Sequence, residues 1–105
     1  MILNQGSPQW IAVSFSSQLP VSQFTIQFQG GFAAKEIQLK RVPEGEVAEA
    51  EVVETFFPED SNGLQIFTLT NFPVLTDNLK FVFPESTDIF GRTIVYQLDI
   101  FQKVI

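Results

Sequence analysis

FTIQFQGG, residues 24–31, is the stretch that decides the fold of this chain. Apolar and polar side chains alternate along it, because single polar residues separate Phe24, Ile26 and Phe28. A period of two sends one set of side chains into a core and the other toward solvent, which is typical of a half-buried β-strand. Two glycines follow, where the chain leaves the strand and needs backbone freedom.

Six further segments carry strand signals of the same kind. They are short, rich in Val, Ile, Thr and Phe, and separated by clusters of Gly, Pro, Asn and Asp. These segments are Trp10–Phe15, Glu36–Lys40, Glu51–Phe57, Leu64–Leu69, Leu79–Phe83 and Ile94–Phe101. Gln18-Leu19-Pro20 predicts a turn after the first of them. Seven strands at short and fairly even spacing predict an all-β sandwich or barrel rather than alternating strands and helices.

Two of these segments allow a finer prediction. Val47–Glu51 tolerates a helical turn, but the β-branched residues that follow it favour a strand that begins at about Glu51. In the last segment, the even-numbered residues from 94 to 100, including Tyr96, are predicted to share one face. That alternation places Phe101 on the opposite, outward face of the strand.

Length and apolar content bound the organisation of the chain. Its 105 residues fit a single domain over residues 1–105. Because ordering such a chain costs on the order of 100–200 kcal/mol, nearly all of its twelve Phe side chains must be buried. Any Phe left outside would be informative, and exposed Phe residues that cluster together would mark a partner site. The candidates are Phe32 and Phe90, which lie beside glycines in loops, and the outward-facing Phe101.

The residue types that are missing exclude most chemistry. Without His and Cys, the chain lacks the usual general base, the thiol nucleophile, disulfides and the common zinc ligands. We therefore expect no enzymatic activity and no cofactor or metal. The net charge of −6, with seven of the twelve acids in Glu44–Asp60, makes nucleic acids and anionic membranes poor partners. No secretion signal or membrane span is visible, which predicts an intracellular protein in nucleus or cytoplasm.

Two loops contain polar residues that are candidates for a site. Glu59–Gly63 offers several oxygen ligands beside a glycine, which is a weak calcium signal, and a tight turn is the favoured interpretation. Arg92 follows Asp88 by four residues, so an ion pair at the rim is favoured over a contact with a ligand or partner.

Three segments of the chain resemble one known family. They are FQGGF at 28–32, FPEDSNGLQ at 57–65 and TDIFGRTIVY at 87–96, and with Gln9-Trp10 they extend the resemblance over nearly the whole chain. They are similar to the small proteins that associate with the orphan nuclear receptor called testicular receptor four. The segments occur in the order and spacing of that family, and TDIFGR is the most specific part.

The resemblance implies both a fold and a function. The fold would be a jelly roll of the galactose-binding-like (discoidin) type, a β-sandwich shared with coagulation-factor type C domains, whose members bind sugars, lipids or proteins with end loops. The function would be repression of nuclear-receptor-driven transcription through direct binding to the receptor, in the nucleus. No catalytic residue carries over from the family.

The residues and the resemblance together leave three functions open. The first is a protein-interaction domain with a protein partner, such as a nuclear receptor. The second is a carbohydrate-binding module on the same fold, for which Phe32, Asn62 and Arg92 would have to converge in one pocket. A third is a subunit that only completes a larger assembly.

One departure from the family concerns the N-terminal side. The family has a further segment before the position of Gln5-Gly6, which contributes the first strand and a loop that holds calcium in some discoidin folds. We expect a domain without that first strand, which leaves the neighbouring strand unpaired and puts any calcium site in doubt. An unpaired edge predicts a homo-oligomer formed by edge-to-edge pairing.

Overall fold

The computed structural model describes residues 9–42, 50–70 and 73–103. The described part contains six strands and no helix, so it offers no helix that could span a membrane. The strands are β1 (Gln9–Phe28), β2 (Ile37–Arg41), β3 (Glu51–Phe56), β4 (Leu64–Thr68), β5 (Val74–Phe83) and β6 (Val95–Gln102). The predicted all-β class is confirmed, and β3 begins at the predicted residue.

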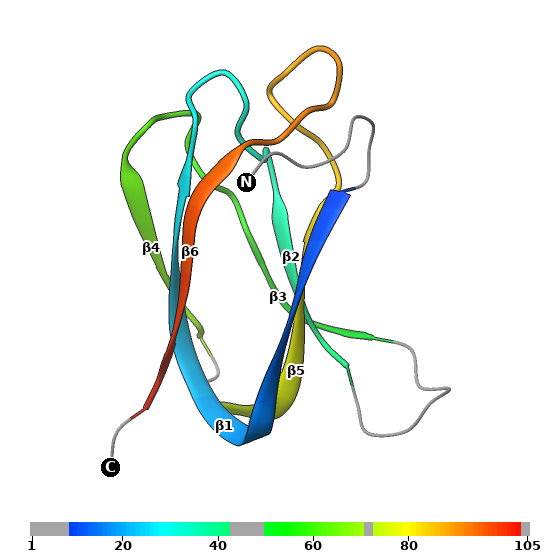
Figure 1. The fold of residues 1–105 in the computed structure, drawn as a ribbon, viewed down its shortest axis with the longest axis vertical. Coiled ribbons are helices and arrows are strands. Elements are labelled where there is room, and N and C mark those ends of the chain that lie inside the picture. The colour runs from blue at the N-terminus through cyan, green and yellow to red at the C-terminus, as the bar shows by residue number, and fades with distance from the viewer. Residues whose placement is uncertain (1–8, 43–49, 71–72, 104–105) are drawn as a thin grey trace.

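The strands form two antiparallel layers that share β1 (Figure 1). The first half of β1 pairs with β5, which is followed by β2 and then β3. The second half, from Gln23 onward, lies between β4 and β6. One long strand thus crosses from the first layer to the second and closes the sandwich at its lower end in the figure.

The predicted turn at Gln18-Leu19-Pro20 is wrong. The chain remains a strand there, since Leu19 pairs with Thr76 and Pro20 with Leu75, and the ladder shifts register after Ser14. A bulge of this kind bends a strand without ending it, and proline is tolerated at such a position because it need not donate to the ladder. The two strands predicted on either side of this turn are therefore parts of one strand, β1. The described residues form six strands, whereas seven were predicted.

The core lies between the two layers, and its largest side chains are phenylalanines. The prediction that nearly all Phe side chains are buried is wrong, because only five of the eleven described ones are buried. Phe24 is fully buried, and its ring centroid lies 5.1 Å from those of Phe56 and Phe81 and 5.3 Å from that of Phe67. Edge-to-face and tilted rings at this spacing are favourable aromatic contacts. The predicted burial of the three apolar side chains in residues 24–28 is confirmed. The predicted alternation is incomplete, because Thr25 between them is also buried.

The last strand differs from the alternation that its sequence predicts. Val95 is buried and Tyr96 is exposed, because the ladder between β1 and β6 shifts register between Gln27 and Phe28. The shift reverses the faces at the start of β6 only. Phe101 lies on an outward-facing position, as predicted, and exposes 43% of its surface.

Candidate functional site

Three loops meet at one end of the sandwich, which we call the loop end: residues 29–36, 57–63 and 84–94 (Figure 1). They follow β1, β3 and β5, and the last residues of these three strands lie at the same end of the sandwich. Loops carried on a rigid β-scaffold are common places for binding residues. The loop end is therefore the candidate site of this domain.

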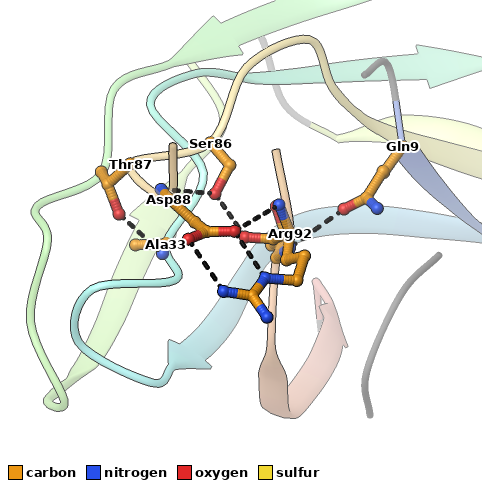
Figure 2. Close-up of polar contacts among 7 residues, drawn as sticks. Gln9, Ala33, Ser86, Thr87, Asp88 and Arg92 are labelled. Carbon is orange, nitrogen blue, oxygen red and sulfur yellow. Dashed lines mark hydrogen bonds and ion pairs between the residues drawn. The ribbon is translucent and has the colours of Figure 1, made fainter. Parts of the chain in front are cut away.

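Loop 29–36 is the centre of the loop end because it holds the other two loops. Backbone hydrogen bonds join it to loop 84–94. These bonds run from Lys35 N to Glu85 O (2.9 Å), from Thr87 N to Ala33 O (2.8 Å) and from Ile94 N to Phe32 O (2.9 Å). The Thr87 hydroxyl oxygen also accepts a hydrogen bond from Ala33 N at 3.1 Å, as Figure 2 shows.

Loop 57–63 is held by side-chain oxygens. Asn62 Oδ1 accepts a hydrogen bond from Gly30 N, and Asp60 Oδ1 accepts one from Gly31 N, each at 2.7 Å. Gly31 has φ of +87°, a conformation that favours glycine. Both bonds therefore join loop 57–63 to loop 29–36. The described residues contain no cluster of three or more acidic side chains that could hold a metal ion.

Asp88 and Arg92 form the polar centre of loop 84–94 (Figure 2). Asp88 Oδ2 accepts hydrogen bonds from Arg92 Nε at 2.7 Å and from Arg92 N at 3.0 Å, while Oδ1 accepts one from an Arg92 amino group at 3.2 Å. The Ser86 hydroxyl donates to Arg92 O and accepts from Asp88 N. The predicted ion pair is present, and it fixes the shape of the loop.

The guanidinium of Arg92 also lies against two aromatic rings. Its central carbon is 5.1 Å from the ring centroid of Phe32 and 5.3 Å from that of Phe90. Both distances are within the range of cation–π attraction. Phe90 nevertheless exposes 66% of its surface, and the adjacent Ile89 exposes 88%. We call Ile89 and Phe90 the apolar tip.

The ion pair makes the loop sensitive to acid. Hydrogen bonding by the Arg92 side chain lowers the pKa of Asp88 below its ordinary value of 3.8. A carboxyl group whose pKa falls on folding stabilises the folded state above its unfolded pKa, and this contribution is lost as pH falls through the folded pKa.

We therefore expect Asp88→Asn to have a lower thermal midpoint than the wild type at pH 7. The gap should remain constant down to about pH 4 and close below the unfolded pKa. Thermal unfolding followed by circular dichroism from pH 7 to pH 2 measures this gap. A gap that does not depend on pH would show that the carboxylate charge is not involved.

The five candidate residues from the sequence do not all lie together. Phe32, Phe90 and Arg92 are in contact, and Asn62 lies in the adjacent loop, bonded to Gly30. Phe101 pairs with Gln23 near the other end of β6, so it belongs to a separate surface. The structure thus brings four of the five to the loop end.

Sequence reasoning missed three residues of the loop end. Ile89 and Phe57, which exposes 71% of its surface, are apolar residues in polar loops, and that contrast was the available signal. Gln9 belongs to the segments that carry the family resemblance, but it was not a candidate for the site. Its Oε1 accepts a hydrogen bond from Thr93 N at 3.1 Å and ties the start of β1 to loop 84–94 (Figure 2).

The loop end combines an open hollow with exposed apolar side chains. An open hollow of about 420 Å³ lies beside the apolar tip, lined by residues that include Lys35, Glu85 and Thr87. The carboxylate of Asp88 is engaged by Arg92, and the amide oxygen of Asn62 by Gly30. The exposed residues of loop 84–94 are Glu85 and the two residues of the apolar tip.

Solved structures share the fold at low sequence identity. A chitosan-binding module from a chitosanase/glucanase of Paenibacillus sp. IK-5 has a TM-score of 0.73 at 15% identity, over 94% of this chain and 72% of that one. A family 32 carbohydrate-binding module of C. perfringens, solved with galactose, has a TM-score of 0.72 at 14% identity, over 89% and 66%. The galactose-binding-like sandwich predicted from the sequence is confirmed.

Sequence relatives are closer. No protein-family model matches the chain. The nuclear receptor 2C2-associated protein of Danio rerio is 43% identical over 97 residues, which are 92% of this chain and 67% of the relative. The Homo sapiens protein of the same name is 40% identical over 97 residues, with the same coverage. At this identity over about two thirds of the relatives' length, the resemblance found in the sequence is confirmed, and the chain belongs to the family of nuclear receptor 2C2-associated proteins.

Proposed function

We propose that this chain is a non-catalytic protein-interaction domain that binds a nuclear receptor through the loop end. The apolar tip carries the proposal, because Ile89 and Phe90 are exposed on a loop that hydrogen bonds and the Asp88–Arg92 pair hold in one shape. Exposed apolar side chains that are already ordered bind with little entropy cost. The names of the relatives support a nuclear receptor as partner.

The polar groups of the loop end favour a protein over a sugar as ligand. Sugar sites need several polar groups that point toward the ligand. Here the Asp88 carboxylate binds Arg92, and the amide oxygen of Asn62 binds the backbone of Gly30. The aromatic and apolar surface stays outward, as a protein interface requires.

The proposal is tested by measuring binding to purified nuclear receptor 2C2. Substitution of both tip residues, Ile89→Ser and Phe90→Ser, is expected to weaken binding at least roughly tenfold, because each removes an apolar anchor. A matched control substitutes Val52→Ser and Leu75→Ser, which each expose 55% of their surface outside the loop end. The control should bind as the wild type does.

Each other outcome has a distinct meaning. If the tip variant binds as tightly as the wild type, the loop end is not the receptor site. If the wild type does not bind the receptor, the receptor proposal fails. If a glycan array shows sugar binding that Arg92→Ala abolishes, and no receptor is bound, the carbohydrate-binding alternative replaces it.

We further propose that binding represses transcription driven by the receptor in the nucleus. A protein that occupies a receptor surface can compete with the receptor's other partners. In a reporter assay, the wild type should lower receptor-driven expression, whereas the variant that lacks the apolar tip should not. If the wild type and this variant repress expression equally, repression does not depend on the loop end.

Self-association is a separate part of the proposal. Among the described strands, β3, β4, β6 and the first half of β1 each pair on one side only. Open strand edges present unpaired N–H and C=O groups that can pair with another chain. Sedimentation at rising concentration should show the mass moving from monomer toward dimer, and a monomer at every concentration would contradict self-association.

A further inference from the structure

We propose that β4 is the edge through which two copies of this chain pair, antiparallel and centred on Ile66. The inference rests on the proposed self-association and is independent of receptor binding. Its subject is one uncharged strand, LQIFT at residues 64–68, at the end of the layer that also contains β1 and β6.

The edges of β3 and β6 carry features that discourage pairing. Charges and register shifts blunt strand edges in natural sheets. β3 contains Glu51 and Glu54, and its ladder with β2 shifts register. β6 contains Asp99, and its ladder with β1 shifts register in two places. By contrast, β4 has no charged residue and no proline, and its five pairs with β1 run without a shift.

The first half of β1 is also uncharged, but its outward face differs from that of β4. Its one large outward side chain is Trp10, which exposes 54% of its surface and has the Lys80 ammonium 4.5 Å from its ring centroid. The next outward residues are the small Ala12 and Ser14. β4 turns two large apolar side chains outward, Leu64 with 51% and Ile66 with 64% of their surface exposed. Of these two uncharged edges, β4 thus offers more apolar surface for a partner to bury.

β4 is held rigidly in one register. Phe67 points into the core, where its ring centroid lies 5.3 Å from those of both Phe24 and Phe56. Gln65 exchanges two hydrogen bonds with the backbone of Glu59, at 2.8 and 2.9 Å. Because side chains alternate along a strand, this anchoring fixes Ile66 on the outward face.

A second copy suits this edge because its sequence is self-complementary. When two such strands pair antiparallel about Ile66, each Ile66 faces its copy, and each Leu64 faces Thr68 of the other strand. Cross-strand pairs between apolar and β-branched residues stabilise a sheet. The net charge of −6 repels two copies in general, but no acid lies on this strand.

The proposed register is tested by cysteine cross-linking, for which the absence of native Cys is an advantage. In the dimer, directly opposite residues have Cβ atoms about 4.5–5.5 Å apart, so two copies of Ile66→Cys should form a disulfide on mild oxidation. Leu64 and its copy would lie about 13 Å apart, which is too far for a disulfide. We expect covalent dimers from Ile66→Cys and almost none from Leu64→Cys or Ala12→Cys.

Sedimentation of charged variants provides the second test. Ile66→Lys places two like charges opposite each other and should raise the dimer dissociation constant at least roughly tenfold. Leu75→Lys, at a residue of similar exposure on β5, should leave it unchanged. Circular dichroism checks that both variants remain folded.

The remaining outcomes overturn the inference in distinguishable ways. If dimers form in the wild type but persist in Ile66→Lys, or if Ala12→Cys cross-links best, self-association stands and β4 is the wrong edge. If Leu64→Cys and Ile66→Cys cross-link equally, the register is wrong. If the wild type is a monomer at every concentration, self-association and the β4 dimer are both ruled out, while the receptor proposal is unaffected. If Ile66→Lys loses receptor binding but no dimer exists, β4 binds a strand of another protein instead.

Discussion

Phe24→Ala is expected to lower the free energy of unfolding by about 3–5 kcal/mol, the usual cost of truncating a buried Phe. Phe24 is fully buried and contacts the rings of Phe56, Phe67 and Phe81, so these would line the resulting cavity. Domains of this kind are stable by only about 5–15 kcal/mol, and the variant should therefore be partly unfolded at moderate denaturant concentrations. Urea unfolding followed by circular dichroism measures the difference.

A matched control for this core substitution is Phe57→Ala. Phe57 exposes 71% of its surface, so its removal should change stability by no more than about 0.5 kcal/mol. The expected losses in the free energy of unfolding thus differ by several kcal/mol between the two variants, because Phe24 is buried and Phe57 is exposed. Equal losses in the two variants would mean that the aromatic cluster around Phe24 is not the core.

Gly31→Val is expected to destabilise the protein by roughly 1–3 kcal/mol, the cost of a sparsely populated backbone conformation. Gly31 has φ of +87°, which a β-branched residue strongly disfavours. An added Cβ would meet nothing within 4 Å, so the loss would arise from the backbone rather than from a clash. The N–H of Gly31 donates to Asp60, and the strain should therefore also loosen loop 57–63.

Gly63→Ala is the control that separates backbone strain from loop mutation in general. Gly63 is not among the described glycines with positive φ, and its added Cβ would make only an ordinary contact with Ser61 Oγ at 3.8 Å. Its expected effect is within about 0.5 kcal/mol. Hydrogen exchange at the amides of loop 57–63 should accelerate in Gly31→Val only. If Gly31→Val has the stability and the amide hydrogen exchange of the wild type, the backbone at Gly31 is not strained by the substitution.

The sandwich explains how this chain presents a defined surface at the loop end. Its two layers bring three loop connections to one end, and loop 29–36 ties the other two together through Gly30 and Gly31 on one side and Ala33 and Lys35 on the other. The apolar tip is thus supported by the fold and not by its own loop alone. This support is what the proposed contact with a protein partner requires.

Local patterning was sufficient for most strands. The buried apolar positions in residues 24–28, the start of β3 and the position of β4 could all be predicted, because a period of two and flanking turn residues are local properties. The missing His and Cys likewise follow from the sequence alone. The apolar tip could be predicted only in part, since Phe90 was a candidate and Ile89 was not.

The sequence by itself therefore determined the fold class, the burial of the apolar side chains at positions 24, 26 and 28, and the absence of His and Cys. Tertiary structure decided that Gln18–Pro20 bends within β1 and that Tyr96 faces outward, because both depend on the register against partners distant in the sequence. It also decided that Arg92 lies between Phe32 and Phe90. Phe32 and Arg92 are far apart along the chain, and no local pattern encodes a contact that exists only when the two layers close.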